Sequence, residues 1–257
     1  MLRTNQLKRA LLEGREVYGV MASMPTAASI ELIGEAGFDY VVIDTEHVLI
    51  NPETIEHMIR TAESYGMTPL VRVADTDPKQ LLRLLDGGAQ GIMLPNVASA
   101  ASLADAVAAC KYAPEGARSL NAGRPGGFGK SSLAEYVGQA NQETMVIAMI
   151  ESCRGVQQIE AICAVPGLDM VLEGAADLSQ SLGVTWQTDH PDVVQSLEHV
   201  QRTAQAFGIP YGAFLRHSRA KARWQARGVH TFMLGDERGI AFRALQKSLH
   251  EAKDVSH

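Results

Sequence analysis

Eight short apolar segments, separated by stretches with helical periodicity, constrain the fold of this 257-residue chain more than any other feature. Each segment is β-branched or apolar throughout, which is typical of strands buried on both faces of a parallel sheet. The predicted strands cover residues 17–21, 40–43, 68–73, 91–94, 145–150, 169–172, 211–214 and 231–234.

The intervening stretches carry helix start and stop signals. Asn51-Pro52-Glu53 combines an N-cap, a proline in the first turn and an acidic residue. Further helices are predicted over 27–36, 78–86, 99–111, 154–164, 191–207, 219–227 and 239–252. Strict alternation of eight strands with helices in about 250 residues favours a (β/α)8 TIM barrel, an α/β fold. A doubly wound open sheet has the same alternation, and spacing alone leaves it open.

No linker or break in composition divides the chain, so we expect one domain over residues 1–257. A polar amphipathic helix is predicted over 2–13, before the first strand. The only long irregular stretch is 113–130, which is rich in Gly, Pro and Arg. A loop of that length in a compact domain is usually functional, so we predict an active-site loop there.

Composition excludes several classes of partner. The net charge is −6 and the sequence contains no basic run, so nucleic acid is not an expected partner. No apolar run approaches the ~20 residues needed to cross a bilayer, so no membrane association is expected. The three scattered cysteines, Cys110, Cys153 and Cys163, argue against a disulfide framework and favour the reducing cytoplasm.

Polar residues interrupt the apolar pattern at one place in several units, directly after the strand. They are Asp44, Glu46 and His47 after the second strand, Arg72 at the end of the third, Glu151 after the fifth and Asp177 after the sixth. Barrel enzymes place their chemistry at this carboxyl end. Each residue alone has a structural interpretation, such as a helix cap for Asp44, but their joint placement predicts an active site.

Two carboxylates without a competing thiol suit a hard divalent cation such as Mg²⁺ or Mn²⁺. Glu151 and Asp177 are the candidate ligands, and they would leave several coordination positions open. A 2-oxo acid can fill two of these with its carboxylate and keto oxygens, and the cation then polarises the ketone.

Motifs spread in order over almost the whole chain resemble the HpcH/HpaI aldolase and citrate lyase family of metal-dependent pyruvate aldolases. These are Gly37-Phe38-Asp39-Tyr40, Ile43-Asp44-Thr45-Glu46-His47, Pro69-Leu70-Val71-Arg72, Gly88-Ala89-Gln90-Gly91 with Pro95, Tyr112-Ala113-Pro114 with Gly116 and Arg118, Ile150-Glu151, and Gly174-Ala175-Ala176-Asp177-Leu178-Ser179.

The resemblance implies a barrel with defined residue roles. Glu151 and Asp177 would bind the metal, His47 would be the general base, and Arg72 would bind the keto acid and its enolate oxygen. A carboxylate corresponding to Asp86 would steer His47. Backbone amides around Gly174, Ala176 and Asp177 would hold the substrate carboxylate. Members of the family are commonly homo-oligomers, often hexamers.

Some residues depart from the aldolase pattern and indicate a particular branch. Glu173 stands where an apolar residue is usual, and Ala175 replaces a usual proline. The segment 173–183, together with Trp186-Gln187, Trp224-Gln225-Ala226 and Leu234-Gly235-Asp236, resembles the citrate synthases of staphyloferrin-type siderophore pathways.

Three functions therefore remain. The favoured one is condensation of oxaloacetate with acetyl-CoA, in which Arg118 or Arg124 of the 113–130 loop would offset the substrate's negative charge. The alternative is aldol cleavage of 4-hydroxy-2-oxo acids to pyruvate and an aldehyde. A catalytically silent barrel is the third, against which the intact set of His47, Arg72, Glu151 and Asp177 argues.

Overall fold

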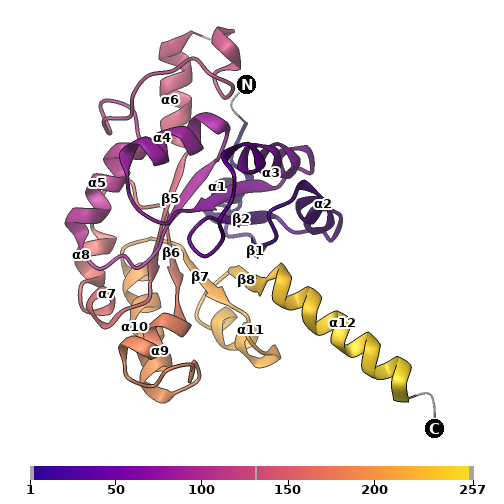
Figure 1. Cartoon of the computed structure of the whole chain (residues 1–257). Coiled ribbons are helices and arrows are strands. Elements are labelled where there is room, and N and C mark those ends of the chain that lie inside the picture. Colours follow the sequence, from indigo (N-terminus) through magenta and orange to yellow (C-terminus); the bar gives the residue numbers. More distant parts are fainter. Residues whose placement is uncertain (1–2, 131, 255–257) are drawn as a thin grey trace.

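In the computed structural model, which describes residues 3–130 and 132–254, eight parallel strands form a closed barrel in sequential order (Figure 1). Closure confirms the (β/α)8 barrel and excludes the open sheet. The strands are β1 (Val17–Ala22), β2 (Tyr40–Asp44), β3 (Thr68–Arg72), β4 (Gly91–Leu94), β5 (Met145–Ile150), β6 (Met170–Glu173), β7 (Tyr211–Phe214) and β8 (Thr231–Asp236).

Strand register brings the expected polar residues to one level. In the β2–β3 pair, Tyr40 lies opposite Thr68 and Asp44 lies opposite Arg72. The β1–β8 pair closes the barrel, with a register shift between Gly19 and Met21. Since all strands are parallel, their carboxyl ends surround one opening, which we call the barrel mouth.

Helices surround the barrel (Figure 1). They are α1 (Gln6–Leu12), α2 (Ala27–Glu35), α3 (Pro52–Ser64), α4 (Pro78–Gly87), α5 (Ala100–Cys110), α6 (Leu133–Glu143), α7 (Cys153–Gln157), α8 (Ile159–Cys163), α9 (Ala175–Ser181), α10 (Pro191–Ala206), α11 (Ser218–Gln225) and α12 (Glu237–Asp254), with a short 3-10 turn η1 (Gly127–Gly129). Two helices, α6 and α9, were not predicted, and the helix predicted over 154–164 is divided into α7 and α8.

The N-terminal helix is shorter than the predicted 2–13. Helix α1 begins after Asn5, whose side chain accepts a hydrogen bond from the Lys8 N–H, so the cap fixes the start. The first two residues of the chain lie outside the described part. No helix in the described segments combines the length and apolarity required to cross a membrane.

Side-chain alternation divides the core into two layers. Inward positions fill the barrel with long flexible side chains, including Met93, Met145 and Met170, and α1 closes its amino end with Leu7 and Ala10. Outward positions pack under the helices in a second, larger cluster. Methionine suits the barrel interior because it adapts to irregular gaps.

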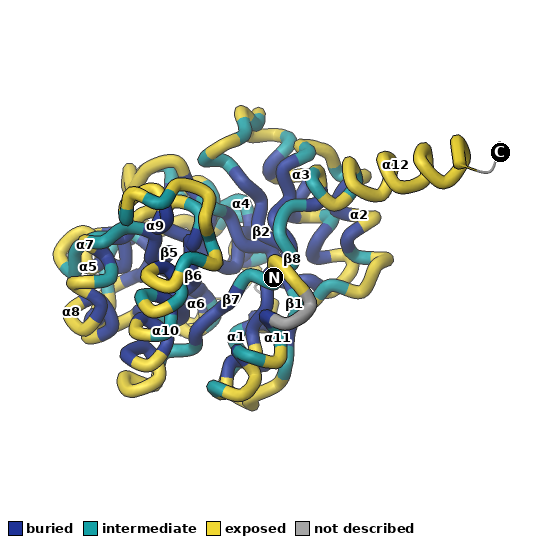
Figure 2. The backbone as a smooth tube through the Cα atoms, turned by 90° about the horizontal axis from the view of Figure 1, so that it is seen from below, coloured by how far each residue is buried: buried dark blue, intermediate teal, exposed yellow. Residues whose placement is uncertain are grey.

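Helix α12 differs from the other helices because it extends away from the barrel, with the C-terminus at its far end (Figures 1 and 2). Its first residue, Glu237, is buried, but Phe242, Leu245 and Leu249 are 64%, 71% and 54% exposed. These three residues lie on one side of the helix by its 3.6-residue period. The protein therefore presents an unpartnered apolar stripe, which is uncommon on a monomeric surface.

Candidate active site at the barrel mouth

The polar residues of the mouth continue the inward-facing series of the strands. In β2 the inward side chains are Tyr40 and Val42, and Asp44 is next in that period. Similarly, Arg72 follows Leu70 in β3, and Glu151 follows Met149 of β5. Strands β2, β3 and β5 thus change from apolar to charged at their carboxyl ends, which gathers these groups at the mouth.

Arg72 is held rigidly by two carboxylates. Its Nε and Nη2 donate to Asp44 Oδ1 and Oδ2 at 3.0 and 2.8 Å, and its Nη1 lies 3.2 Å from Glu46 Oε2. Burial raises the pKa of Asp44, but the hydrogen bond and charge of Arg72 outweigh it and lower the pKa below its ordinary value. A bidentate pair fixes the guanidinium plane, so Arg72 is preorganised.

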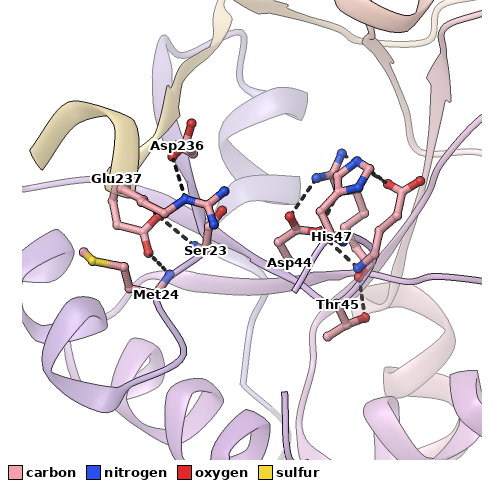
Figure 3. Close-up of polar contacts among 10 residues, drawn as sticks. Ser23, Met24, Asp44, Thr45, His47, Asp236 and Glu237 are labelled. Carbon is pink, nitrogen blue, oxygen red and sulfur yellow. Dashed lines mark hydrogen bonds and ion pairs between the residues drawn. The ribbon is translucent and has the colours of Figure 1, made fainter. Parts of the chain in front are cut away.

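His47 lies on the mouth side of the loop after β2. Its backbone N–H donates to Asp44 Oδ1 at 3.4 Å, and its Nε2 lies 3.7 Å from Glu46 Oε2. The imidazole is 61% exposed and lines the mouth cavity. Figure 3 shows His47 beside Asp44 on one side of the mouth, and Asp236 and Glu237 with Ser23 and Met24 on the other. An accessible imidazole with a carboxylate neighbour can accept a proton from a bound substrate.

Glu151 is a buried carboxylate with an unusual environment. Its Oε1 accepts the Asn96 N–H at 2.6 Å, and Asn96 has a φ of 45°, in the left-handed region. A Cβ on Gly174 would collide with the Glu151 side chain, so glycine makes room for it. Burial raises the pKa of Glu151 to about 7, and the charges of Asp177 and Glu46 add to this effect.

The donors present fit a hard divalent cation. Glu151 and Asp177 contribute oxygens only, and their mutual repulsion would be relieved by a positive ion. In residues 3–130 and 132–254, no three or more His, Cys, Asp or Glu side chains group as a metal site. The chain would therefore supply two carboxylates, and water or substrate would complete the coordination.

The mouth forms a cavity of about 440 Å³. Gly174, Ala176 and Asp177 line it from the end of β6 and the start of α9. The exposed Trp186 and half-buried Phe214 also contribute to its wall. This volume accommodates a small organic acid.

Among the described residues of this chain, Asp86, Arg118 and Arg124 are not part of the lining of the mouth cavity. Asp86, in the last turn of α4, accepts hydrogen bonds from Arg118 Nη2 at 2.7 Å and Asn121 Nδ2 at 3.0 Å. No contact joins Asp86 to His47 among the described residues. Arg124 pairs with Glu63 and donates to the Gly87 carbonyl.

Arg118 and Arg124 line a separate cavity of about 480 Å³ beside Glu63, Gln90 and Tyr136. Carboxylates at the ends of α3 and α4 pair with these arginines, so the 113–130 loop is tied to the helix ends rather than to the mouth of its own barrel. Sequence reasoning could not identify these pairs because the partners are distant along the chain.

Sequence reasoning also missed three charged residues that line the mouth: Arg216, Asp236 and Arg238. Arg216 donates from Nη1 to Glu173 Oε1 at 2.5 Å. The charged residue at position 173, where an apolar one is usual, was the available signal for this pair. Asp236 and Arg238 lie at the end of β8 and the start of α12, where the Glu237 carboxylate also accepts from the Ser23 and Met24 N–H groups at 2.7 and 2.6 Å.

Comparisons with known proteins agree with this geometry. The family model for HpcH/HpaI aldolase/citrate lyase matches residues 18–244. A 5-keto-4-deoxy-D-glucarate aldolase of Shigella dysenteriae serotype 1 (strain Sd197) is 32% identical over 244 residues, which cover 95% of this chain and 94% of the relative.

Two solved structures are also similar over nearly the whole chain. The citrate synthase SbnG has 44% identity and a TM-score of 0.91, and the match covers 96% of this chain and 97% of SbnG. An HpcH/HpaI aldolase from Desulfitobacterium hafniense DCB-2 has 33% identity and a TM-score of 0.91, with 96% of each chain covered. The carbon–carbon bond-forming or bond-cleaving chemistry of these enzymes extends to this chain, which belongs to the HpcH/HpaI aldolase/citrate lyase family.

Proposed function

We propose that the protein condenses oxaloacetate with acetyl-CoA to form citrate, as a citrate synthase of siderophore biosynthesis. The observation that carries the proposal is the mouth itself, where Arg72, His47 and the two carboxylates Glu151 and Asp177 surround one cavity. The likeness to the citrate synthase SbnG supports this reaction over other carbon–carbon chemistry.

Each residue has a task in this reaction. Glu151 and Asp177 would hold Mg²⁺ or Mn²⁺, which when bound would polarise the ketone of the 2-oxo acid. Arg72, fixed by Asp44, would donate hydrogen bonds to the substrate and stabilise negative charge on its oxygen. The amides of Ala176 and Asp177 would bind the carboxylate next to the ketone.

The proton steps fall to His47. It would remove a proton from the methyl group of acetyl-CoA, and the resulting carbon nucleophile would attack the ketone carbon of oxaloacetate. The new alkoxide would take up a proton, and water would hydrolyse the thioester to release CoA and citrate. Overall, oxaloacetate, acetyl-CoA and water give citrate and CoA.

Aldol cleavage of a 4-hydroxy-2-oxo acid to pyruvate and an aldehyde is the second candidate. It uses the same four residues, and the glucarate-derived aldolase of Shigella supports it. Two measurements on one preparation separate the candidates. With oxaloacetate and acetyl-CoA we expect thiol release and citrate, and we expect little pyruvate from 4-hydroxy-2-oxo acids. Rapid pyruvate release without thiol release would make the protein an aldolase.

The metal assignment is tested separately. Glu151→Gln and Asp177→Asn should each lose bound metal in elemental analysis while they keep their circular dichroism spectrum. Glu53→Gln, at an exposed carboxylate of α3, is the matched control and should keep its metal. Stoichiometric metal in both site variants would refute the assignment.

A homo-oligomer, as large as a hexamer, is part of the proposal. The support is the exposed apolar stripe of α12, which a second copy of the chain would cover.

A further inference from the structure

Arg216 is a second cationic group at the mouth, on the wall formed by β7. It comes two residues after Phe214, the last residue of that strand, and its guanidinium lies 5.0 Å from the Phe214 ring centroid. Both residues line the same cavity as Arg72 and His47. The mouth therefore has one fixed arginine on β3 and another after β7.

A carboxylate behind the wall holds Arg216 in place. Glu173, the last residue of β6, is 1% exposed and faces away from the barrel interior, in the outward series of Val171. Its Oε1 accepts from Arg216 Nη1 at 2.5 Å, and its Oε2 accepts from the Tyr211 hydroxyl at 3.1 Å. Both carboxylate oxygens are thus satisfied, as a buried charge requires.

The fold does not need a charge at position 173. A neutral side chain with one acceptor would suffice for the Tyr211 hydroxyl, whereas a buried carboxylate is costly unless its charge is paired. Glu173 is therefore explained by its effect on Arg216. A guanidinium carries five N–H donors in a fixed plane, so an arginine held through Nη1 can offer other donors to a ligand.

We propose that Arg216, positioned by Glu173, binds the distal carboxylate of a four-carbon 2-oxo dicarboxylate and so selects it over pyruvate. This inference rests on the proposed function, in which the ketone end of the substrate lies between Glu151, Asp177 and Arg72. Preorganisation supports Arg216 over Arg238, which also lines the mouth cavity. Arg238 has a side chain that is 61% exposed, and its ion pair with Asp236 is 3.9 Å long.

The test compares two stable ligands of the metal-loaded protein by titration calorimetry. Oxalate has two carbons and probes the ketone end alone, while malate has four carbons and adds the distal carboxylate. Arg216→Ala should raise the Kd for malate by about 10- to 100-fold, as expected for hydrogen bonds between charged groups, and should change the oxalate Kd by less than about threefold. Arg216→Lys should recover part of the malate affinity, because it keeps the charge without the planar fork.

Three further variants keep the test decisive. Arg216→Ala leaves Glu173 buried without its partner, so the double variant Glu173→Gln/Arg216→Ala provides a folded protein that lacks the cation. Glu173→Gln alone should weaken malate binding to an intermediate degree. Arg238→Ala should leave the ratio of the two affinities near that of the wild type.

The outcomes are distinguishable. The role of Arg216 would be overturned if Arg216→Ala lost affinity equally for both ligands or kept an unchanged malate Kd. It would also be overturned if the wild type did not bind malate, or if the selective loss of malate affinity occurred in Arg238→Ala instead. Failure of the wild-type protein to bind oxalate in the presence of the metal would instead refute the proposed function.

Discussion

At the scale of single residues, the arrangement of the mouth depends on carboxylates that pair with its arginines. Asp44 and Glu46 hold the Arg72 guanidinium, and Glu173 holds that of Arg216. Glu151 has only a backbone N–H donor among its described hydrogen bonds, at Asn96. Glu151, one of the two carboxylates proposed to bind a metal, thus has no hydrogen-bonded cationic partner among the described residues. Two predictions follow, one from the environment of Glu151 and one from that of His47.

The first concerns the stability of metal-free protein. The folded pKa of Glu151, about 7, exceeds its ordinary value of 4.5, so folding favours the protonated form. The resulting destabilisation is absent below pH 4.5, grows as the pH rises toward 7 and is complete above it. Glu151→Gln should therefore stabilise the metal-free protein at pH 8 by about 3 kcal/mol and have little effect near pH 4.5. Denaturant unfolding with a chelator present measures this, and equal effects at both pH values would contradict it.

The second concerns proton transfer. His47→Ala should lower kcat by about 10²- to 10⁴-fold, the usual contribution of a general base, with little change in oxalate affinity. His57→Ala, at an exposed histidine on α3, serves as the control and should keep its activity. A loss of only a few-fold in His47→Ala would reduce its role to positioning.

At the scale of elements, the sequence predicted what depends on local pattern. The strands were placed to within one or two residues, because the apolar runs and the turn residues before them are local signals. Helix α6 was missed because its capping box, Ser132 with Glu135, follows an irregular Gly-rich stretch. The roles of Asp86, Arg118 and Arg124 could not be derived, because each depends on which distant helix end the 113–130 loop contacts.

Within this chain, Arg118 and Arg124 of that loop pair with Asp86 and Glu63, and a prediction follows for Arg118. Arg118 has a side chain that is only 2% exposed, pairs with Asp86, and has its guanidinium 4.6 Å from the Tyr112 ring centroid. Arg118→Ala should destabilise the protein by about 2–4 kcal/mol, because it leaves Asp86 without its cationic partner and removes the stacked guanidinium. Thermal unfolding tests this, and Arg118→Lys should recover part of the loss. A variant with wild-type stability but a raised KM would return Arg118 to the substrate site.

At the scale of the whole molecule, the barrel closes, but most of its last helix, α12, does not pack against it. The start of α12 is fixed, since Glu237 binds the Ser23 and Met24 amides and Asp236 Oδ1 accepts the Gly239 N–H at 2.7 Å. Beyond that turn the helix leaves the barrel (Figure 2). Because most helical stability in proteins comes from packing of an apolar face, the projecting part needs a surface to cover it.

The last prediction tests whether another copy of the chain supplies that surface. Phe242→Asp combined with Leu245→Asp places two charges on the apolar stripe, so sedimentation should show a smaller particle than the wild-type assembly at equal concentration. Ala244→Asp introduces one charge on the opposite face by the helical period and should leave the assembly intact. Circular dichroism of the variants would verify that the barrel stays folded, since the mutated residues are exposed and lie outside the two core clusters. A wild-type protein that sediments as a monomer, or a double variant that keeps the wild-type mass, would exclude α12 as the contact between subunits.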